Sequence, residues 1–85
     1  LMAIGRLAQR YGVRVAPHNP SGPVATAFSL AAACAMPNCE ILEIQYGEVD
    51  WRPSLVQPAE RISGGRMSPN NLPGCGVSLS RYDFP

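Results

Sequence analysis

An alanine-rich run at residues 23–36, set between two short aliphatic segments, constrains the fold more than any other feature of this sequence. Proline at the first position of the run suits the first turn of a helix, and Ser21 or Gly22 would cap that turn. Residues 13–16 and 40–45, on either side of the run, are predicted strands. Because a helical crossover of this length joins parallel neighbours, we expect an α/β architecture.

Residues 1–11 carry a second helical pattern. Apolar side chains recur at spacings that place them on one face of a helix, at Ile4, Leu7, Ala8 and Tyr11. Gly12 is well placed to end this helix, because glycine readily adopts the left-handed conformation that closes a last turn. The predicted order is therefore helix, strand, helix, strand.

The rest of the chain is predicted to be less regular. Residues 61–67 are expected to form a short hairpin around Gly64-Gly65, a dipeptide suited to a tight turn. We treat residues 1–85 as one unit, with the predicted helices and strands in residues 1–47 and an irregular tail in residues 48–85. Two parallel strands and one crossover helix cannot shield both faces of a sheet, so we expect the chain to be the carboxyl-terminal part of a larger α/β protein.

Charge and composition exclude several classes of partner. Seven Lys and Arg against six Asp and Glu give a net charge of +1, too weak a basic field for nucleic acid or an anionic membrane surface. The longest weakly polar stretch, residues 23–37, is shorter than the roughly 20 residues that cross a bilayer. Three cysteines, Cys34, Cys39 and Cys75, match no zinc or redox spacing, which favours reduced thiols in a cytoplasmic protein.

His18 is the single histidine and directly follows the first predicted strand. The carboxyl ends of parallel strands are where α/β sheets and barrels gather their catalytic groups. An imidazole near neutral pH either donates or accepts a proton, as general acid or base catalysis requires. The alternative interpretation is a loop histidine that makes one backbone hydrogen bond.

Glu43 lies in the second predicted strand, where alternation puts Leu42 and Ile44 on the opposite face. Because burial of an unpaired carboxylate is costly, a carboxyl group near a strand end is paired, protonated or functional. Adjacent parallel strands would bring His18 and Glu43 to the same rim, where they could share one substrate. Trp51 is a weaker candidate for substrate contact, since such a tryptophan is more often a packing residue.

Five short segments of the sequence, compared together with known families, are informative about the class of protein. They are residues 11–23, which read Tyr-Gly-Val-Arg-Val-Ala-Pro-His-Asn-Pro-Ser-Gly-Pro, then Pro37-Asn38, Ile41-Leu42-Glu43, Asp50-Trp51-Arg52, and residues 72–77, which read Leu-Pro-Gly-Cys-Gly-Val. This set resembles the carboxyl-terminal part of the mandelate racemase and muconate lactonizing enzyme family of the enolase superfamily. The likeness is closest to galactonate dehydratase-like acid-sugar dehydratases. Cys75 is a departure, because that turn commonly carries leucine in the family.

The resemblance implies a modified TIM-type (β/α)7β barrel, of which this chain supplies the last two strands, the crossover helix and the tail. It implies a hydro-lyase, a class of lyase, that acts on a small acid-sugar molecule, with Mg²⁺ stabilising an enediolate intermediate. His18 would be the general acid, or the base in racemase-like relatives, and Glu43 would hydrogen-bond the substrate carboxylate as charge develops. The family's metal ligands lie on earlier strands, so we expect no metal ligand in this chain. Family members are often homo-oligomers.

Two other interpretations stay open. One is a racemase or epimerase of the same family, in which His18 exchanges the α-proton without loss of hydroxide. The other is a catalytically inactive fragment that folds only by docking on partner chains. In each case we expect the isolated chain of 85 residues to be inactive, because it carries only two of the groups that the reaction needs.

Overall fold

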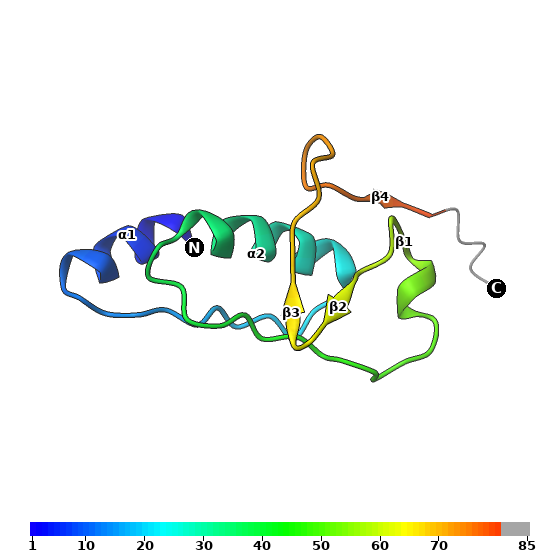
Figure 1. The fold of residues 1–85 in the computed structure, drawn as a ribbon, viewed down its shortest axis with the longest axis horizontal. Helices are drawn as coiled ribbons and strands as arrows, with labels where there is room; N and C mark the ends of the chain where they lie inside the picture. The colour runs from blue at the N-terminus through cyan, green and yellow to red at the C-terminus, as the bar shows by residue number, and fades with distance from the viewer. Residues whose placement is uncertain (81–85) are drawn as a thin grey trace.

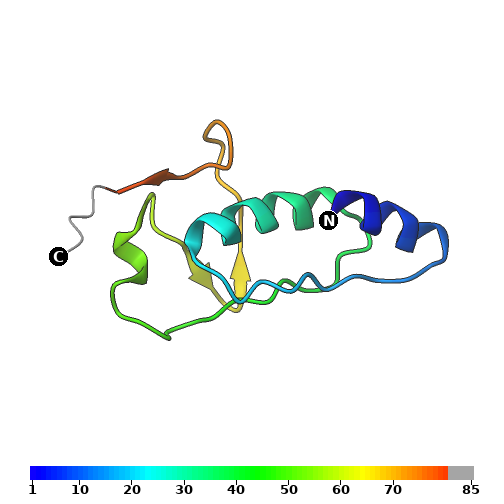
Figure 2. The same ribbon diagram turned by 180° about the vertical axis from the view of Figure 1, so that it is seen from behind.

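Two helices and two extended segments form the first half of the molecule in this computed structural model, which describes residues 1–80 (Figure 1). Helix α1 spans Met2–Arg10 and helix α2 spans Pro23–Ala35. The extended segments run alongside both helices, and the view from behind shows the same arrangement (Figure 2). The second half contains a 3-10 turn, η1, and four short strands: η1 Arg52–Ser54, β1 Val56–Gln57, β2 Ile62–Ser63, β3 Arg66–Met67 and β4 Ser78–Leu79.

Helix α1 ends as predicted. Gly12 has a φ angle of 67°, in the left-handed region that glycine tolerates. Its N–H donates to the carbonyl oxygen of Gln9 at 3.1 Å, and the N–H of Val13 donates to the carbonyl oxygen of Ala8 at 2.9 Å. These two bonds form a Schellman motif, which satisfies the last carbonyl groups of the helix and turns the chain back along it.

Helix α2 also agrees with its prediction to within one residue. Gly22 is the N-cap, Pro23 occupies the first turn, and Met36 follows the last helical residue as the C-cap. The side chain of Thr26 is fully buried at the amino-terminal end of the helix. A buried hydroxyl needs hydrogen-bond partners, and those of Thr26 lie in the site described below.

The predicted strands at residues 13–16 and 40–45 lie parallel to each other, but they do not form a regular ladder. Only one bridge joins them, between Val15 and Cys39. Three backbone hydrogen bonds connect the segments: Val15 N–H to Asn38 O (2.9 Å), Glu40 N–H to Val15 O (2.9 Å) and Glu43 N–H to Pro17 O (3.4 Å). Pro17 accepts the last of these bonds but has no N–H to return, so no regular ladder continues past it. The parallel order of the prediction is confirmed, and its regular strands are wrong for this structure.

The tail contains two separate pairs of antiparallel strands. Strands β2 and β3 form the predicted hairpin, with Ile62 opposite Met67 and with Gly64 and Gly65 at φ angles of 58° and 70°. Two positive φ angles are what a primed hairpin turn requires. Strands β1 and β4 also pair, with Val56 opposite Leu79, and this pairing was not predicted from the sequence.

The buried core is small for a chain of this length. Met36 and Val56 are the buried hydrophobic residues among residues 1–80. The radius of gyration is 14.0 Å, whereas a compact domain of this size has about 12 Å. Among the described residues, no helix combines the length and the apolar character that a bilayer crossing demands.

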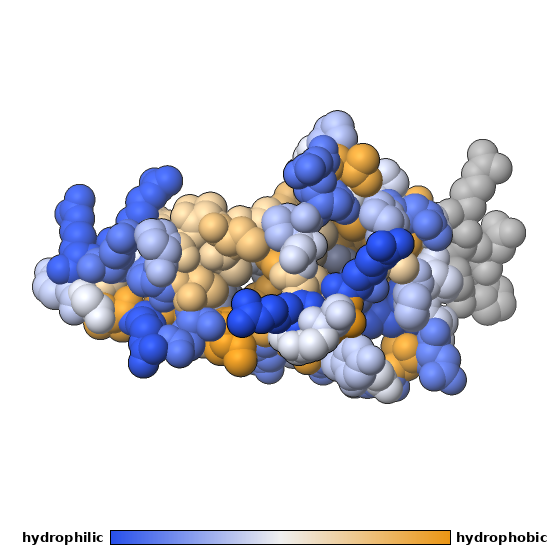
Figure 3. Space-filling view, viewed as in Figure 1, coloured by the Kyte–Doolittle hydropathy of each residue, from blue (hydrophilic) through white to orange (hydrophobic). Residues whose placement is uncertain are grey.

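Many of the large apolar side chains are exposed to solvent. The face predicted for the first helix is not covered, since Ile4, Leu7 and Tyr11 are 68%, 56% and 79% exposed. Phe28 on α2 is also exposed, and the space-filling view shows a broad apolar area over α2 (Figure 3). Apolar surface of this extent is typical of a face that packs against other protein.

Candidate active site

His18 and Glu43 lie in contact. The Nδ1 atom of His18 is 2.7 Å from the Oε2 atom of Glu43. Each residue follows the paired part of its extended segment, so the parallel order of the two segments brings both to one rim. The predicted juxtaposition of the two residues is therefore confirmed.

The two side chains are accessible to a ligand. The His18 side chain is 81% exposed and that of Glu43 is 47% exposed. A carboxylate only accepts hydrogen bonds, so the Nδ1 atom of His18 carries the hydrogen in this contact. The Nε2 atom is then left free of this contact.

Asn19 fixes Glu43 at two points. Its backbone N–H donates to the Oε2 atom of Glu43 at 2.9 Å, and its side-chain Nδ2 donates to the carbonyl oxygen of Glu43 at 3.0 Å. Asn19 is only 2% exposed. The exposed pair of His18 and Glu43 therefore rests on a buried polar residue.

Three more polar residues support Asn19 from the interior. Thr26 on α2 accepts a hydrogen bond from Asn19, and Arg52 from η1 donates to the same hydroxyl. Arg52 also forms an ion pair with Glu60, in which both side chains are largely buried. The hydrogen bond to Glu60 raises the pKa of Arg52 above its ordinary value; the negative charges of Glu60 and Glu48 act in the same direction, and desolvation opposes them.

These supporting residues were not predicted as site residues from the sequence. Asn19 could have been noticed because it directly follows His18, and Thr26 because it is a polar residue in an apolar helix. No sequence signal connects Arg52 with Glu60, since the pair depends on the path of the tail.

Trp51 stands apart from this group. It precedes η1 and is 53% exposed. Within residues 1–80 no hydrogen bond joins it to His18 or Glu43. Its predicted contact with substrate remains a prediction.

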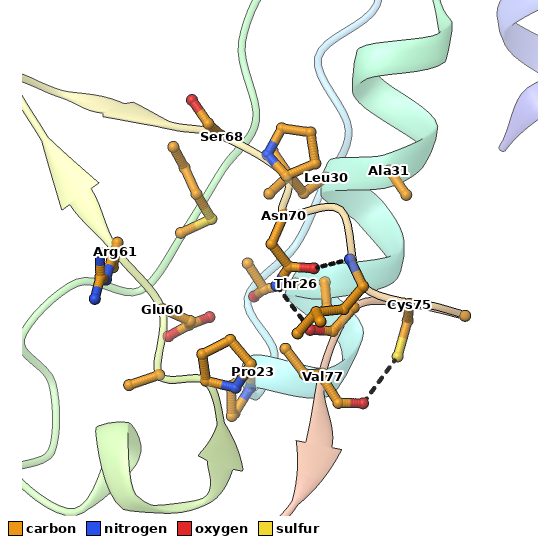
Figure 4. Close-up of a pocket in the computed structure, with 18 residues that line it drawn as sticks. Pro23, Thr26, Leu30, Ala31, Glu60, Arg61, Ser68, Asn70, Cys75 and Val77 are labelled. Carbon is orange, nitrogen blue, oxygen red and sulfur yellow. Dashed lines mark hydrogen bonds between the residues drawn. The ribbon is translucent and has the colours of Figure 1, made fainter.

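Two of the hollows on the surface of residues 1–80 are large, and neither is lined by His18 or Glu43. One, of about 340 Å³, lies between α2 and residues 58–77, with Thr26 and Glu60 in its wall (Figure 4). The other, of about 610 Å³, is lined by residues of the 44–63 stretch, including Arg52 and Glu60. His18 and Glu43 lie instead on an open rim outside both hollows. We take this rim as the candidate site because it brings a proton carrier and a carboxylate together.

The chain does not supply a metal centre within the part that the structure describes. Residues 1–80 contain no group of three or more His, Cys, Asp or Glu side chains that could hold a metal ion. Cys34, Cys39 and Cys75 are free thiols.

A helix between two parallel segments, with an imidazole and a carboxylate in contact at one rim, is an arrangement typical of α/β enzymes. The chain belongs to the Enolase C-terminal domain-like family, which it matches over residues 1–83. The resemblance identified from the sequence is confirmed.

Two curated relatives are similar in sequence. The chain is 37% identical over 76 residues to a D-xylonate dehydratase of Haloferax volcanii, a match that covers 89% of this chain and 18% of that protein. It is 36% identical over 81 residues to a D-galactonate dehydratase family member of Streptomyces bingchenggensis, covering 93% of this chain and 20% of that protein. The chain thus spans about a fifth of the length of each relative.

Solved structures of the same superfamily share the fold. A protein described as a candidate L-alanine-DL-glutamate epimerase from Burkholderia xenovorans superposes with a TM-score of 0.84 at 28% identity, over 91% of this chain and 20% of that one. An enolase of the mandelate racemase subgroup from Agrobacterium tumefaciens gives a TM-score of 0.77 at 28% identity, with the same coverage of both chains. The α/β fold of this chain is therefore that of the enolase superfamily.

Proposed function

We propose that this chain is the carboxyl-terminal part of the barrel of an acid-sugar dehydratase, a hydro-lyase that removes water from a polyhydroxy carboxylic acid. The contact between His18 and Glu43 at one rim carries the proposal, because the reaction needs a proton carrier beside a group that binds a carboxylate. The two curated relatives, which are named as a D-xylonate dehydratase and as a D-galactonate dehydratase family member, support the substrate class.

The proposed reaction is a β-elimination. A base removes the proton on the carbon next to the substrate carboxylate, and the electron pair forms a carbon–carbon double bond. The hydroxyl group on the following carbon leaves with a proton from the Nε2 atom of His18 as water. The resulting enol takes up a solvent proton to give a 2-keto acid, so atoms and charges balance.

Glu43 would bind the substrate carboxylate. Its Oε2 atom accepts from the N–H of Asn19 and contacts His18, while its Oε1 atom makes no hydrogen bond within residues 1–80. A hydrogen bond between two carboxyl groups needs one shared proton, and this bond strengthens as negative charge builds on the substrate.

The cofactor implied by the family is Mg²⁺, and one structural neighbour is described as bound to magnesium and fumarate. Because residues 1–80 offer no metal-ligand cluster, we propose that residues outside this chain hold the ion in the full-length protein. The contribution of this chain is proton transfer by His18 and carboxylate binding by Glu43.

The exposed apolar surface supports the proposal that further protein completes the barrel. Ile4, Leu7 and Tyr11 on α1 and Phe28 on α2 would be covered by that remainder. The parallel segments at residues 13–16 and 40–45 would then gain strand neighbours on their outer edges.

The second candidate is an epimerase or racemase of the same superfamily. It is favoured by the Burkholderia xenovorans neighbour, which is described as a candidate epimerase and has a TM-score of 0.84. In this case His18 would return a proton to the same carbon, and no carbon–oxygen bond would break.

Incubation of the full-length protein with D-xylonate and D-galactonate in deuterium oxide separates the two functions. Dehydration is expected to give a product one water lighter, with deuterium on the carbon that lost the hydroxyl, because the enol takes its proton from solvent. Recovery of substrate that has gained deuterium at its α-carbon, without loss of water, would instead establish the epimerase. The measurement is mass spectrometry of product and recovered substrate.

A further inference from the structure

A continuous chain of hydrogen bonds connects the exposed rim with the interior. Asn19 bonds to Glu43 on one side and donates from Nδ2 to the Thr26 hydroxyl at 2.9 Å on the other. Arg52 donates from Nη2 to the same hydroxyl at 3.0 Å and pairs with Glu60. Asn19 and Thr26 are 2% and 0% exposed, so water does not replace these bonds.

The hydrogen bonds in this chain have fixed directions. The Arg52 guanidinium only donates, so the Thr26 hydroxyl must accept from it. The Thr26 hydroxyl gives its own hydrogen to the carbonyl oxygen of Gly22 at 3.2 Å, which leaves its second lone pair for Asn19. Both hydrogens of the Asn19 amide are then used, one on Thr26 and one on the Glu43 backbone. The amide therefore has one orientation.

The inner end of the chain is a bidentate ion pair. The Nε atom of Arg52 lies 2.7 Å from Oε2 of Glu60, and Nη2 lies 2.9 Å from Oε1. The Nη1 atom donates to the carbonyl oxygen of Ser21 at 2.8 Å, near the amino-terminal end of α2. The side chains of Arg52 and Glu60 are 11% and 14% exposed. A forked, partly buried pair of this kind holds its geometry better than a single bond.

We propose that Asn19 positions Glu43 for the reaction, and that Thr26 and the Arg52–Glu60 ion pair hold Asn19 in place. The inference rests on the proposed function, because it requires Glu43 to act on the substrate. Asn19 is a positioning residue, since its side-chain amide carries no transferable proton and donates to the backbone carbonyl of Glu43, while its backbone N–H donates to the Glu43 carboxylate. A glutamate held both at its backbone and at its carboxylate meets the substrate in one geometry.

Kinetic analysis of Thr26→Val in the full-length protein tests the proposal, because valine keeps the shape of threonine and lacks its hydroxyl. We expect kcat to fall about tenfold, the usual effect of losing a well-placed hydrogen bond, with little change in KM. Thr26→Ser restores the hydroxyl and is expected to restore most of the kcat. Ser29→Ala, one turn away on the same helix, is the control and should keep kcat within about twofold.

The decisive comparison repeats Thr26→Val in a Glu43→Ala background. If Thr26 acts through Glu43, the second substitution lowers kcat by less than about twofold there. An equal tenfold loss in both backgrounds would overturn the inference, because a merely structural effect does not depend on Glu43. Full activity of Glu43→Ala alone would overturn the proposed function, and this inference with it, so the two failures are distinguishable.

A second variant keeps the test possible if Thr26→Val does not fold, since valine leaves Asn19 and Arg52 without a shared partner. Arg52→Lys retains the positive charge but cannot reach Glu60, Thr26 and Ser21 together. If Arg52→Lys lowers kcat about tenfold in the otherwise unchanged protein and does not lower it in the Glu43→Ala background, the proposal is supported. Equal losses in both would contradict it.

Discussion

Replacing His18 by asparagine in the full-length protein is expected to lower kcat by about 10²–10⁴-fold, the range over which a positioned acid or base acts. Asparagine preserves a polar side chain that can bond Glu43, but it cannot transfer a proton. The side chain is 81% exposed, so the unfolding temperature should change little. Steady-state dehydration of an aldonate measures the effect, and full activity would remove His18 from the mechanism.

A substrate with a better leaving group identifies the step that His18 serves. In an analogue with fluorine in place of the β-hydroxyl group, the leaving group is fluoride, which departs without a proton from the enzyme. If His18 is the general acid, the defect of His18→Asn should shrink by at least about tenfold with this analogue. A defect of the same size with both substrates would mean that His18 is the base that removes the α-proton.

Replacing Glu43 by glutamine should produce the second large effect, a loss of about 10²–10³-fold in kcat, typical of a group that stabilises transition-state charge. Glutamine has nearly the same shape and still accepts from the N–H of Asn19. It cannot share a proton with the substrate carboxylate as a carboxyl group does. Because the proposed bond would strengthen in the transition state, kcat should fall more than KM changes.

Glu40→Gln is the matched control for this substitution. Glu40 lies in the same extended segment and forms an exposed ion pair with Arg14. Exposed pairs of this kind contribute little, so kcat should stay within about twofold. Equal losses in Glu40→Gln and Glu43→Gln would show that charge alone, and not the position of Glu43, matters.

The helices could be predicted from the sequence because their signals are local. Gly12 ends α1 by its left-handed backbone, and Pro23 starts α2 in the turn where it is tolerated. The strands were predicted less well. The alternation of residues around Glu43 correctly predicted an extended segment that runs parallel to residues 13–16. It could not predict the hydrogen-bond ladder, which depends on the protein beside this segment and on the missing N–H of Pro17.

The candidate site could be predicted in part. Parallel strand order alone placed His18 and Glu43 at one rim, and they lie in contact. The residues behind them were missed, because Thr26 and Arg52 meet only when the tail folds against the start of α2. The pairing of β1 with β4 was missed for the same reason, since short strands far apart in the sequence leave no local pattern.

A double-mutant cycle on His18 and Glu43 tests most directly whether the two residues form one site. It compares kcat for His18→Asn, Glu43→Gln and the double variant of the full-length protein. Groups that act as a unit on one transition state are not additive, so the double variant should be at most about tenfold slower than the slower single variant. A loss equal to the product of the two single losses would show that the residues act independently, and would contradict the account.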